Sequence, residues 1–208
     1  MKKIVVEGAP GSGKSILLKG STRKNVEENY PGCLKQRGYK IVPESGPIAV
    51  ERVMKEFGVL DKDKIFGEII KEEVKKFNSL NKADEEPIFF DRGLLGYLPI
   101  SIVHSKTIMP DVFYETCRRL RFDDPIIVLE PVSALDLSKP ADNSQSYAQG
   151  IFSWDERVQI HQLIVEFYKL LGHRIVVVPE KPVESDNLND ILDARTDLIL
   201  KACEDFRG

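Results

Sequence analysis

The sequence predicts an α/β fold of three layers, in which a parallel sheet lies between helices on its two faces. Short apolar runs alternate with segments of helical periodicity along the chain, and the first run leads into a glycine-rich turn that opens a helix. Strands that alternate with helices are joined by right-handed crossovers, so their carboxyl ends share one edge of the sheet. Ligands of such sheets bind at that edge.

Length and composition favour a single domain over residues 1–208, with a substantial core. A hydrophobic fraction of 42% is ordinary for a globular protein, and a net charge of −3 offers no broad attraction for nucleic acid, which is therefore not an expected partner. No apolar run approaches the roughly 18 residues of a membrane span, so no membrane partner is expected. The 3 cysteines are scattered, which favours reduced thiols and a cytoplasmic protein.

The strongest motif follows the first apolar run, residues 2–6. It matches the phosphate-binding loop G-x-x-x-x-G-K-[ST] at every fixed position: Gly8, Ala9, Pro10, Gly11, Ser12, Gly13, Lys14 and Ser15. Its glycines lack Cβ atoms, so several backbone N–H groups can point into one concavity that phosphate oxygens approach closely. A helical pattern begins at the end of the loop and adds its positive dipole end.

Two side chains of this loop predict the cofactors ATP and Mg²⁺. Lys14, expected to be an exposed loop side chain, would reach the β- and γ-phosphates, and the Ser15 hydroxyl would ligate the metal. A glycine-rich turn that binds nothing explains the glycines but not the adjacent lysine and serine. The sequence therefore predicts a nucleoside triphosphate site at residues 8–15.

Further apolar runs predict four more strands, at residues 39–43, 87–90, 125–129 and 174–179. Apolar residues at three- and four-residue intervals predict a helix over 61–80 and a closing helix over 186–206. The charged residues of the first of these helices, such as Glu72 and Lys76 at i,i+4, are expected to form a solvated face. Three arginines before the fourth strand are also expected to face solvent: Arg118, Arg119 and Arg121.

Acidic residues follow three of the predicted strands: Glu44, Asp91 and Glu130. Parallel strands would bring them to one crevice with the phosphate loop. Phosphoryl transfer needs one carboxylate to hold Mg²⁺ and one to orient or deprotonate the attacking hydroxyl. Asp91 is predicted to bind the metal together with Ser15, and Glu44 is predicted to be the base. Each of the three acids has the alternative of being an ordinary loop acid or helix cap.

Two arginines are candidates to bind the transferring phosphate. Arg92 follows Asp91, and its guanidinium presents a rigid fork of donors. Residues 138–150 are polar and weakly periodic, and predict a small mobile lid over residues 131–155. Arg157, at the start of the helix beyond that lid, is predicted to close on the phosphate. The alternatives are a passive surface loop and a solvated arginine that pairs with Asp155 or Glu156.

The motifs together resemble the P-loop kinases of the nucleoside and nucleotide type, and more narrowly the AAA-like predicted-ATPase family related to the nicotinamide-riboside kinase domain. The resemblance extends from the phosphate loop to about Pro179 and rests on Val42-Pro43-Glu44, Phe89 to Gly93, Val128 to Pro131, Asp155 to Arg157 and Leu171 to His173. It implies a P-loop NTPase fold with strand order 2-3-1-4-5, which places Asp91 beside the phosphate loop. Asp91 and Arg92 are similar to the Asp-Arg pair of those kinases, and Glu44 to the acid that deoxynucleoside kinases use on the acceptor hydroxyl.

The sequence therefore predicts ATP/Mg²⁺-dependent phosphoryl transfer to a small nucleoside- or nucleotide-like acceptor. The predicted catalytic residues are Lys14, Glu44, Asp91, Arg92 and Arg157. The alternative is a P-loop ATPase or nucleotide-dependent switch that acts on a protein partner. A GTP-specific protein is disfavoured because the chain lacks the Asn-Lys-x-Asp motif that reads guanine. No sequence signature identifies the acceptor or the oligomeric state.

Overall fold

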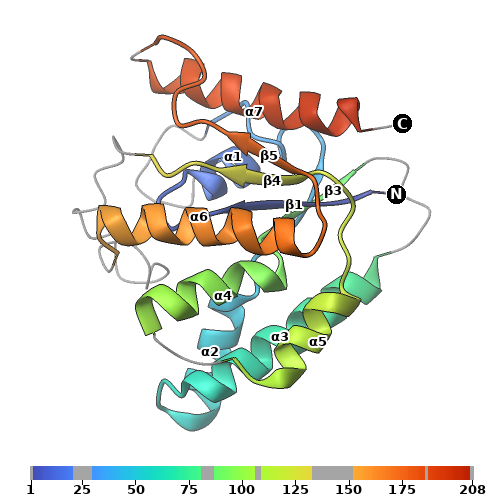
Figure 1. Cartoon of the computed structure of the whole chain (residues 1–208), viewed down its shortest axis with the longest axis vertical. Coiled ribbons are helices and arrows are strands. Elements are labelled where there is room, and N and C mark those ends of the chain that lie inside the picture. The colour runs from blue at the N-terminus through green and yellow to red at the C-terminus, as the bar shows by residue number, and fades with distance from the viewer. Residues whose placement is uncertain are drawn as a thin grey trace.

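The computed structural model describes residues 2–20, 30–80, 87–105, 109–132, 152–185 and 187–206. A parallel sheet of five strands, in the order β2-β3-β1-β4-β5, forms the middle layer (Figure 1). The strands are β1 (Lys3–Gly8), β2 (Lys40–Val42), β3 (Ile88–Asp91), β4 (Ile126–Leu129) and β5 (Ile175–Val178). The predicted α/β class and the strand order are both confirmed.

The register aligns the carboxyl ends of the central strands. On one side of β1, Val6 pairs with Asp91 of β3, and on the other side it pairs with Ile127 of β4. The backbone N–H of Arg92 then donates to the carbonyl of Val6 at 3.1 Å. The residues that follow β1 and β3 are therefore neighbours at one edge of the sheet.

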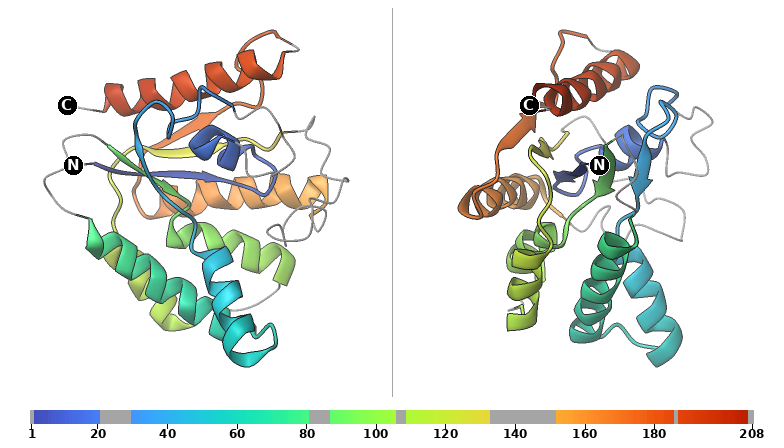
Figure 2. Two further views of the ribbon diagram at one scale, coloured as in Figure 1. Left: turned by 180° about the vertical axis from the view of Figure 1, so that it is seen from behind. Right: turned by 90° about the vertical axis from the view of Figure 1, so that its right-hand side faces the viewer.

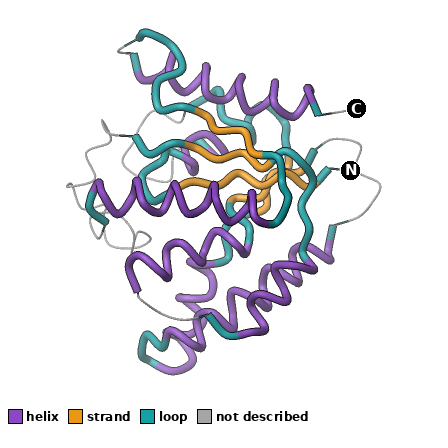
Figure 3. Tube along the Cα trace, in the orientation of Figure 1, coloured by secondary structure: helices purple, strands orange, loops and turns teal. Residues whose placement is uncertain are grey.

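Helices form the two outer layers. They are α1 (Lys14–Lys19), α2 (Gly46–Phe57), α3 (Lys62–Ser79), α4 (Tyr97–Ile100), α5 (Asp111–Arg119), α6 (Trp154–Leu170) and α7 (Leu188–Asp205). A 3₁₀ turn, η1 (Leu94–Gly96), precedes α4, and a π-helical turn, η2 (Ser101–Ser105), continues it. Helices α1 and α7 cover one face of the sheet, whereas α4 and α6 cover the other, with α2, α3 and α5 extending away from it (Figures 1 and 2). Figure 3 shows the strands enclosed between the helices.

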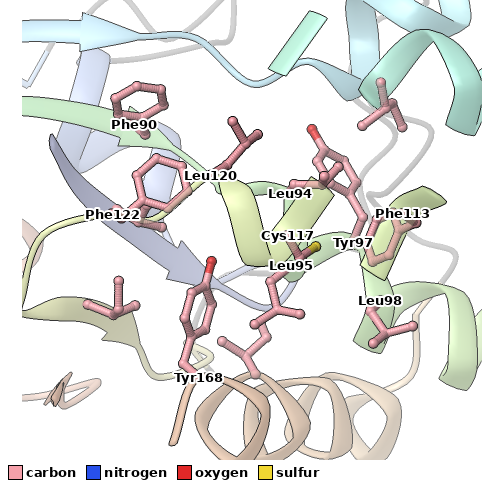
Figure 4. Packing of buried hydrophobic residues seen from close by; sticks show 14 of the residues in the cluster. Phe90, Leu94, Leu95, Tyr97, Leu98, Phe113, Cys117, Leu120, Phe122 and Tyr168 are labelled. Atoms are coloured by element: carbon pink, nitrogen blue, oxygen red, sulfur yellow. The ribbon is translucent and has the colours of Figure 1, made fainter. Parts of the chain in front are cut away.

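A hydrophobic core lies on each face of the sheet. Val5 and Phe90 point into the core beneath α4 and α6, whereas Ile4 and Phe89 point into the core beneath α1 and α7. Aromatic and aliphatic side chains fill the first core, with Phe90 packed edge-on against Phe122 (Figure 4). Because both faces of each central strand are buried, apolar residues run through them without alternation. That pattern is why the strands are readable from the sequence.

The helix predicted over 61–80 forms as α3, whose first turn is capped by the carboxylate of Asp61. The predicted solvated face is wrong for Glu72 and Glu73, which are only 8% and 1% exposed. The reason is that α2 packs beside α3, and Arg52 of α2 forms an ion pair with Glu72, with 2.8 Å between Nη1 and Oε1. The three arginines near the end of α5 are exposed as expected: Arg118, Arg119 and Arg121.

Most of the predicted lid, residues 133–151, lies outside the described residues. Within the described ranges, no helix is both long and apolar enough to cross a membrane.

Candidate active site

The phosphate-binding motif lies between β1 and α1 and adopts a backbone that requires its glycines. Gly11 and Gly13 have φ angles of 83° and 77°, which lie in the left-handed region that side chains rarely adopt. A Cβ atom on Gly8 would lie 2.3 Å from Oγ of Ser12, so any larger residue at position 8 would collide with the loop. The loop therefore needs its glycines to hold this shape, which suits the binding of phosphate oxygens by backbone N–H groups.

Hydrogen bonds to backbone carbonyl groups hold this loop both within itself and from neighbouring segments. The N–H of Ser12 donates to the carbonyl of Ala9 at 3.1 Å, and the N–H of Val132 donates to the carbonyl of Gly11 at 3.2 Å. Arg195 of α7 donates from Nη1 to the carbonyl of Ser12 at 2.9 Å. Sequence reasoning missed Arg195, because nothing local to α7 signals a contact 183 residues away.

Lys14 is buried, not exposed as predicted, with 6% of its side chain accessible. Its Nζ pairs with Oδ1 of Asp91 and lies 3.9 Å from Oε2 of Glu44. The other oxygen of Asp91 pairs with Nζ of Lys19, a residue that sequence reasoning also missed. Lys14 is drawn inward because α1 begins directly over the end of β3, where Asp91 offers the opposite charge.

The charge state of Asp91 follows from these contacts. Burial alone raises the pKa of this carboxyl group, but the two ammonium groups of Lys14 and Lys19 outweigh burial and lower its pKa below the ordinary value. Asp91 is therefore anionic at neutral pH.

Arg92 links the ends of three strands, although its own backbone is strained. Its φ angle of 80° costs a residue with a side chain about 1–3 kcal/mol, a strain of the kind found at functional sites. The guanidinium donates to Oε1 of Glu44 at 2.8 Å, to the carbonyl of Gly8 at 3.1 Å and to the carbonyl of Gly96 at 3.1 Å. Arg92 thereby connects the candidate base to the start of the phosphate loop.

Glu7 is a buried acid beneath this site that sequence reasoning missed. Its Oε1 accepts hydrogen bonds from the N–H of Gly93 and the hydroxyl of Tyr168, both at 2.8 Å, and its Oε2 lies 3.6 Å from Nη1 of Arg92. Burial raises the pKa of Glu7, while Arg92 opposes the rise. The available signal was a charged residue directly after the apolar run of residues 4–6 in the same strand.

A second buried cluster fixes the chain just after Glu44. The hydroxyl of Tyr97 accepts from the N–H groups of Ser45 and Gly46, at 3.1 and 2.8 Å. The hydroxyl of Ser45 donates to Oε1 of Glu73 at 2.5 Å and accepts from Nζ of Lys76 at 2.9 Å. Burial raises the pKa of Glu73 to about 7, against the lowering effect of Ser45. This cluster anchors the segment that carries Glu44.

Two predicted site residues, Glu130 and Arg157, form no hydrogen bond or ion pair with the charged side chains around Lys14 within the described part of the chain. Glu130 instead accepts from the N–H of Glu180 at 3.0 Å, so its carboxylate lies on the β5 side of the sheet. Arg157 stacks on the ring of Trp154, with 5.2 Å between the guanidinium carbon and the ring centre. The expected lid around these residues lies mostly in 133–151, outside the described part of the chain.

The donors at the site suit Mg²⁺. Ser15 and Asp91 offer only oxygen atoms, which this hard cation prefers. The described residues contain no cluster of three or more His, Cys, Asp or Glu side chains able to hold a metal. A site of few protein ligands is typical of Mg²⁺, which keeps water molecules and binds phosphate oxygens of the substrate.

Comparisons with known proteins agree with this fold. A family model described as an AAA domain matches residues 3–185. Thymidylate kinase from Ehrlichia chaffeensis has a TM-score of 0.59 and 14% identity, over 97% of this chain and 98% of that one. Deoxyadenosine kinase from M. mycoides, solved with bound dATP, has a TM-score of 0.54 and 19% identity, over 97% of this chain and 99% of that one. No curated protein sequence matches the chain.

Proposed function

We propose a kinase function for this chain, which belongs to the AAA domain family whose model spans residues 3–185. The protein transfers the terminal phosphoryl group of ATP to a hydroxyl or phosphate group of a small nucleoside- or nucleotide-like acceptor. One observation carries the proposal: Lys14, Glu44, Asp91 and Arg92 form one connected cluster of charges beside the phosphate loop. A base, a metal-binding acid and two cations are the groups that phosphoryl transfer needs.

The phosphate side of the reaction belongs to the loop and Lys14. The loop N–H groups bind phosphate oxygens, and Lys14 exchanges its contact with Asp91 for the β- and γ-phosphates. Ser15 and Asp91 hold Mg²⁺, which supplies positive charge to the phosphates when it is bound. Lys19 remains beside Asp91 after Lys14 moves, and so keeps that carboxylate in place.

The acceptor side belongs to Glu44. It is about one quarter exposed, so a small molecule can reach it, and Arg92 fixes its orientation through Oε1. Its Oε2 lies 3.9 Å from Nζ of Lys14, next to the position that the terminal phosphate would take. Glu44 is thus placed to accept the proton of an acceptor hydroxyl while that hydroxyl attacks phosphorus.

The structural neighbours support the choice of acceptor class. By their names, one phosphorylates a nucleoside monophosphate and the other a nucleoside. Glu44, at the end of β2, offers an acid for a hydroxyl, whereas the guanidinium of Arg92 is only 5% exposed and binds Glu44 and two backbone carbonyl groups. Both acceptor types therefore belong in the test.

ADP release from ATP and Mg²⁺ tests the proposal, with a panel of nucleosides, nucleoside monophosphates and vitamin-like alcohols as acceptors. We expect at least one acceptor to raise the rate well above the rate without acceptor, and Lys14→Ala protein to show neither activity. ADP release that no acceptor changes would contradict a kinase and favour the ATPase or nucleotide-dependent switch.

A further inference from the structure

Arg195 of α7 lies behind the phosphate loop and is only 1% exposed. Its Nη1 donates to the carbonyl of Ser12 at 2.9 Å, and its Nη2 donates to the carbonyl of Glu130 at 3.1 Å. A Cβ atom on Gly13 would lie 3.4 Å from Nη1, so the guanidinium packs directly against the loop backbone. One side chain thus ties α7 and the end of β4 to the site of phosphate binding.

The charge of Arg195 is incompletely compensated. In the described part of the chain its Nε has no hydrogen-bond partner, and the ion pairs formed there do not include it. Glu130 and Glu180 act on it through space, yet burial dominates and lowers the pKa of Arg195 to about 10. A buried guanidinium without a paired anion is costly in free energy. An anion bound nearby would reduce that cost.

The contact with Ser12 also orients the loop. A trans peptide is planar, and its C=O and N–H bonds point in opposite directions. Because the carbonyl of Ser12 points at Arg195, the N–H of Gly13 in the same peptide points away from Arg195. That N–H belongs to the phosphate-binding motif, whose N–H groups bind phosphate oxygens.

We infer that Arg195 is a positioning residue for the triphosphate: it fixes the peptide between Ser12 and Gly13, and the bound phosphates supply the negative charge that its buried guanidinium lacks. The inference rests on the proposed function, since it assumes that the loop binds ATP. It adds to that function a long-range support for the loop, contributed by the last helix of the chain.

The test compares Arg195→Met and Arg195→Lys with Arg37→Met. Arg37 is a matched control, because it pairs with Asp193 and Asp197 on the exposed side of the same helix. Calorimetry would measure the affinities for ATP·Mg²⁺ and for inorganic triphosphate, and thermal melting would measure the stability of the nucleotide-free protein.

We expect Arg195→Met to weaken the binding of both ligands by the same factor, about tenfold or more, since the lost interaction concerns only the phosphates. Arg195→Lys keeps the charge but not the two-pronged geometry, so it should fall between Arg195→Met and the wild type. Arg37→Met should leave both affinities unchanged.

Two results would overturn the inference. One is that Arg195→Met binds both ligands with wild-type affinity. The other is that Arg195→Met and Arg37→Met lose the same amount of affinity and the same amount of melting temperature. If Arg195→Met does not fold, Arg195→Lys is the deciding variant. A wild-type melting temperature together with weaker triphosphate binding supports the inference. Wild-type affinity for triphosphate refutes it. Lys14→Ala distinguishes a failure of the proposed nucleotide site from a failure of the role inferred for Arg195. ATP binding that ignores Lys14 refutes the nucleotide site itself, whereas binding that depends on Lys14 but not on Arg195 refutes only this inference.

Discussion

Arg92 holds Glu44 through a hydrogen bond of 2.8 Å between Nε and Oε1, and so joins the segment after β3 to the segment after β2. The strained backbone of Arg92 places its guanidinium between Glu44 and the carbonyl of Gly8. The candidate base and the start of the phosphate loop are therefore held by separate nitrogens of one guanidinium, Nε and Nη2. Changes at Glu44 should affect transfer to the acceptor without affecting how ATP binds.

Glu44→Gln should leave ATP affinity nearly unchanged and lower acceptor-stimulated ADP release by about 10²- to 10⁴-fold, the contribution of a general base. The amide retains a hydrogen-bonding oxygen for Arg92 but cannot accept the proton. Glu51→Gln, on the exposed surface of α2, is the matched control. Equal losses of transfer and of acceptor-independent hydrolysis in Glu44→Gln would argue against its role as the base.

Asp91→Asn should act on the metal and not on the acceptor. The amide gives up the negative charge that pairs with Lys14 and that would hold Mg²⁺. Since Lys14 is then free to reach the phosphates, metal-free ATP should bind at least as tightly as it binds the wild type. Mg²⁺ should strengthen that binding much less than in the wild type. Dissociation constants of ATP with and without Mg²⁺ measure the difference, and an unchanged effect of Mg²⁺ would exclude Asp91 as a ligand.

Lys14→Ala should destabilise the free protein as well as abolish ATP turnover. The change leaves Asp91, which is 1% exposed, with Lys19 as its remaining ammonium partner. Breaking such a buried pair costs about 1–3 kcal/mol here, less than for a charge left wholly alone. Lys71→Ala, which removes an exposed partner of Glu68, should change the free energy of unfolding by at most about 0.5 kcal/mol. Urea unfolding of both variants checks the contrast, and equal stabilities would contradict the buried pair.

Glu73 should make the protein less stable as pH rises through neutrality. Burial raises its pKa from 4.5 to about 7, so between these values the folded state holds a proton that the unfolded state has lost. The stabilisation is complete below about pH 4.5 and is lost as pH rises through about 7. Glu73→Gln imitates the protonated form, so its melting temperature should rise relative to the wild type between pH 5 and 8. A difference that does not vary with pH would show that Glu73 has an ordinary pKa.

The fold could be predicted because the signals for its strands, helix ends and phosphate loop lie in short stretches of sequence. Strands such as Ile126–Leu129 are apolar on both faces, and Asp61 marks the beginning of α3 with a capping side chain. The phosphate loop is similarly readable, because its glycines are needed at fixed positions. The sequence alone could also place Asp91 and Glu44 after strands, at a common edge of the sheet.

The rest of the site depends on long-range contacts that no local pattern encodes. The buried environment of Lys14 arises because β3 lies next to β1, and Arg195 reaches the loop only through the packing of α7. Glu73 looks like a surface residue of an amphipathic helix until α2 and Ser45 cover it. These residues change from solvent-facing to buried through tertiary packing, which hydrophobic periodicity does not register.

The destination of the γ-phosphate distinguishes a kinase from an ATPase most directly. ATP labelled in its γ-phosphate, Mg²⁺ and the most stimulating acceptor would be incubated with the wild type, with Glu44→Gln and with Lys14→Ala. We expect the label to appear in the acceptor with the wild type, at a rate lowered about 10²- to 10⁴-fold by Glu44→Gln and abolished by Lys14→Ala. Label found only in inorganic phosphate, whatever acceptor is present, would contradict a kinase.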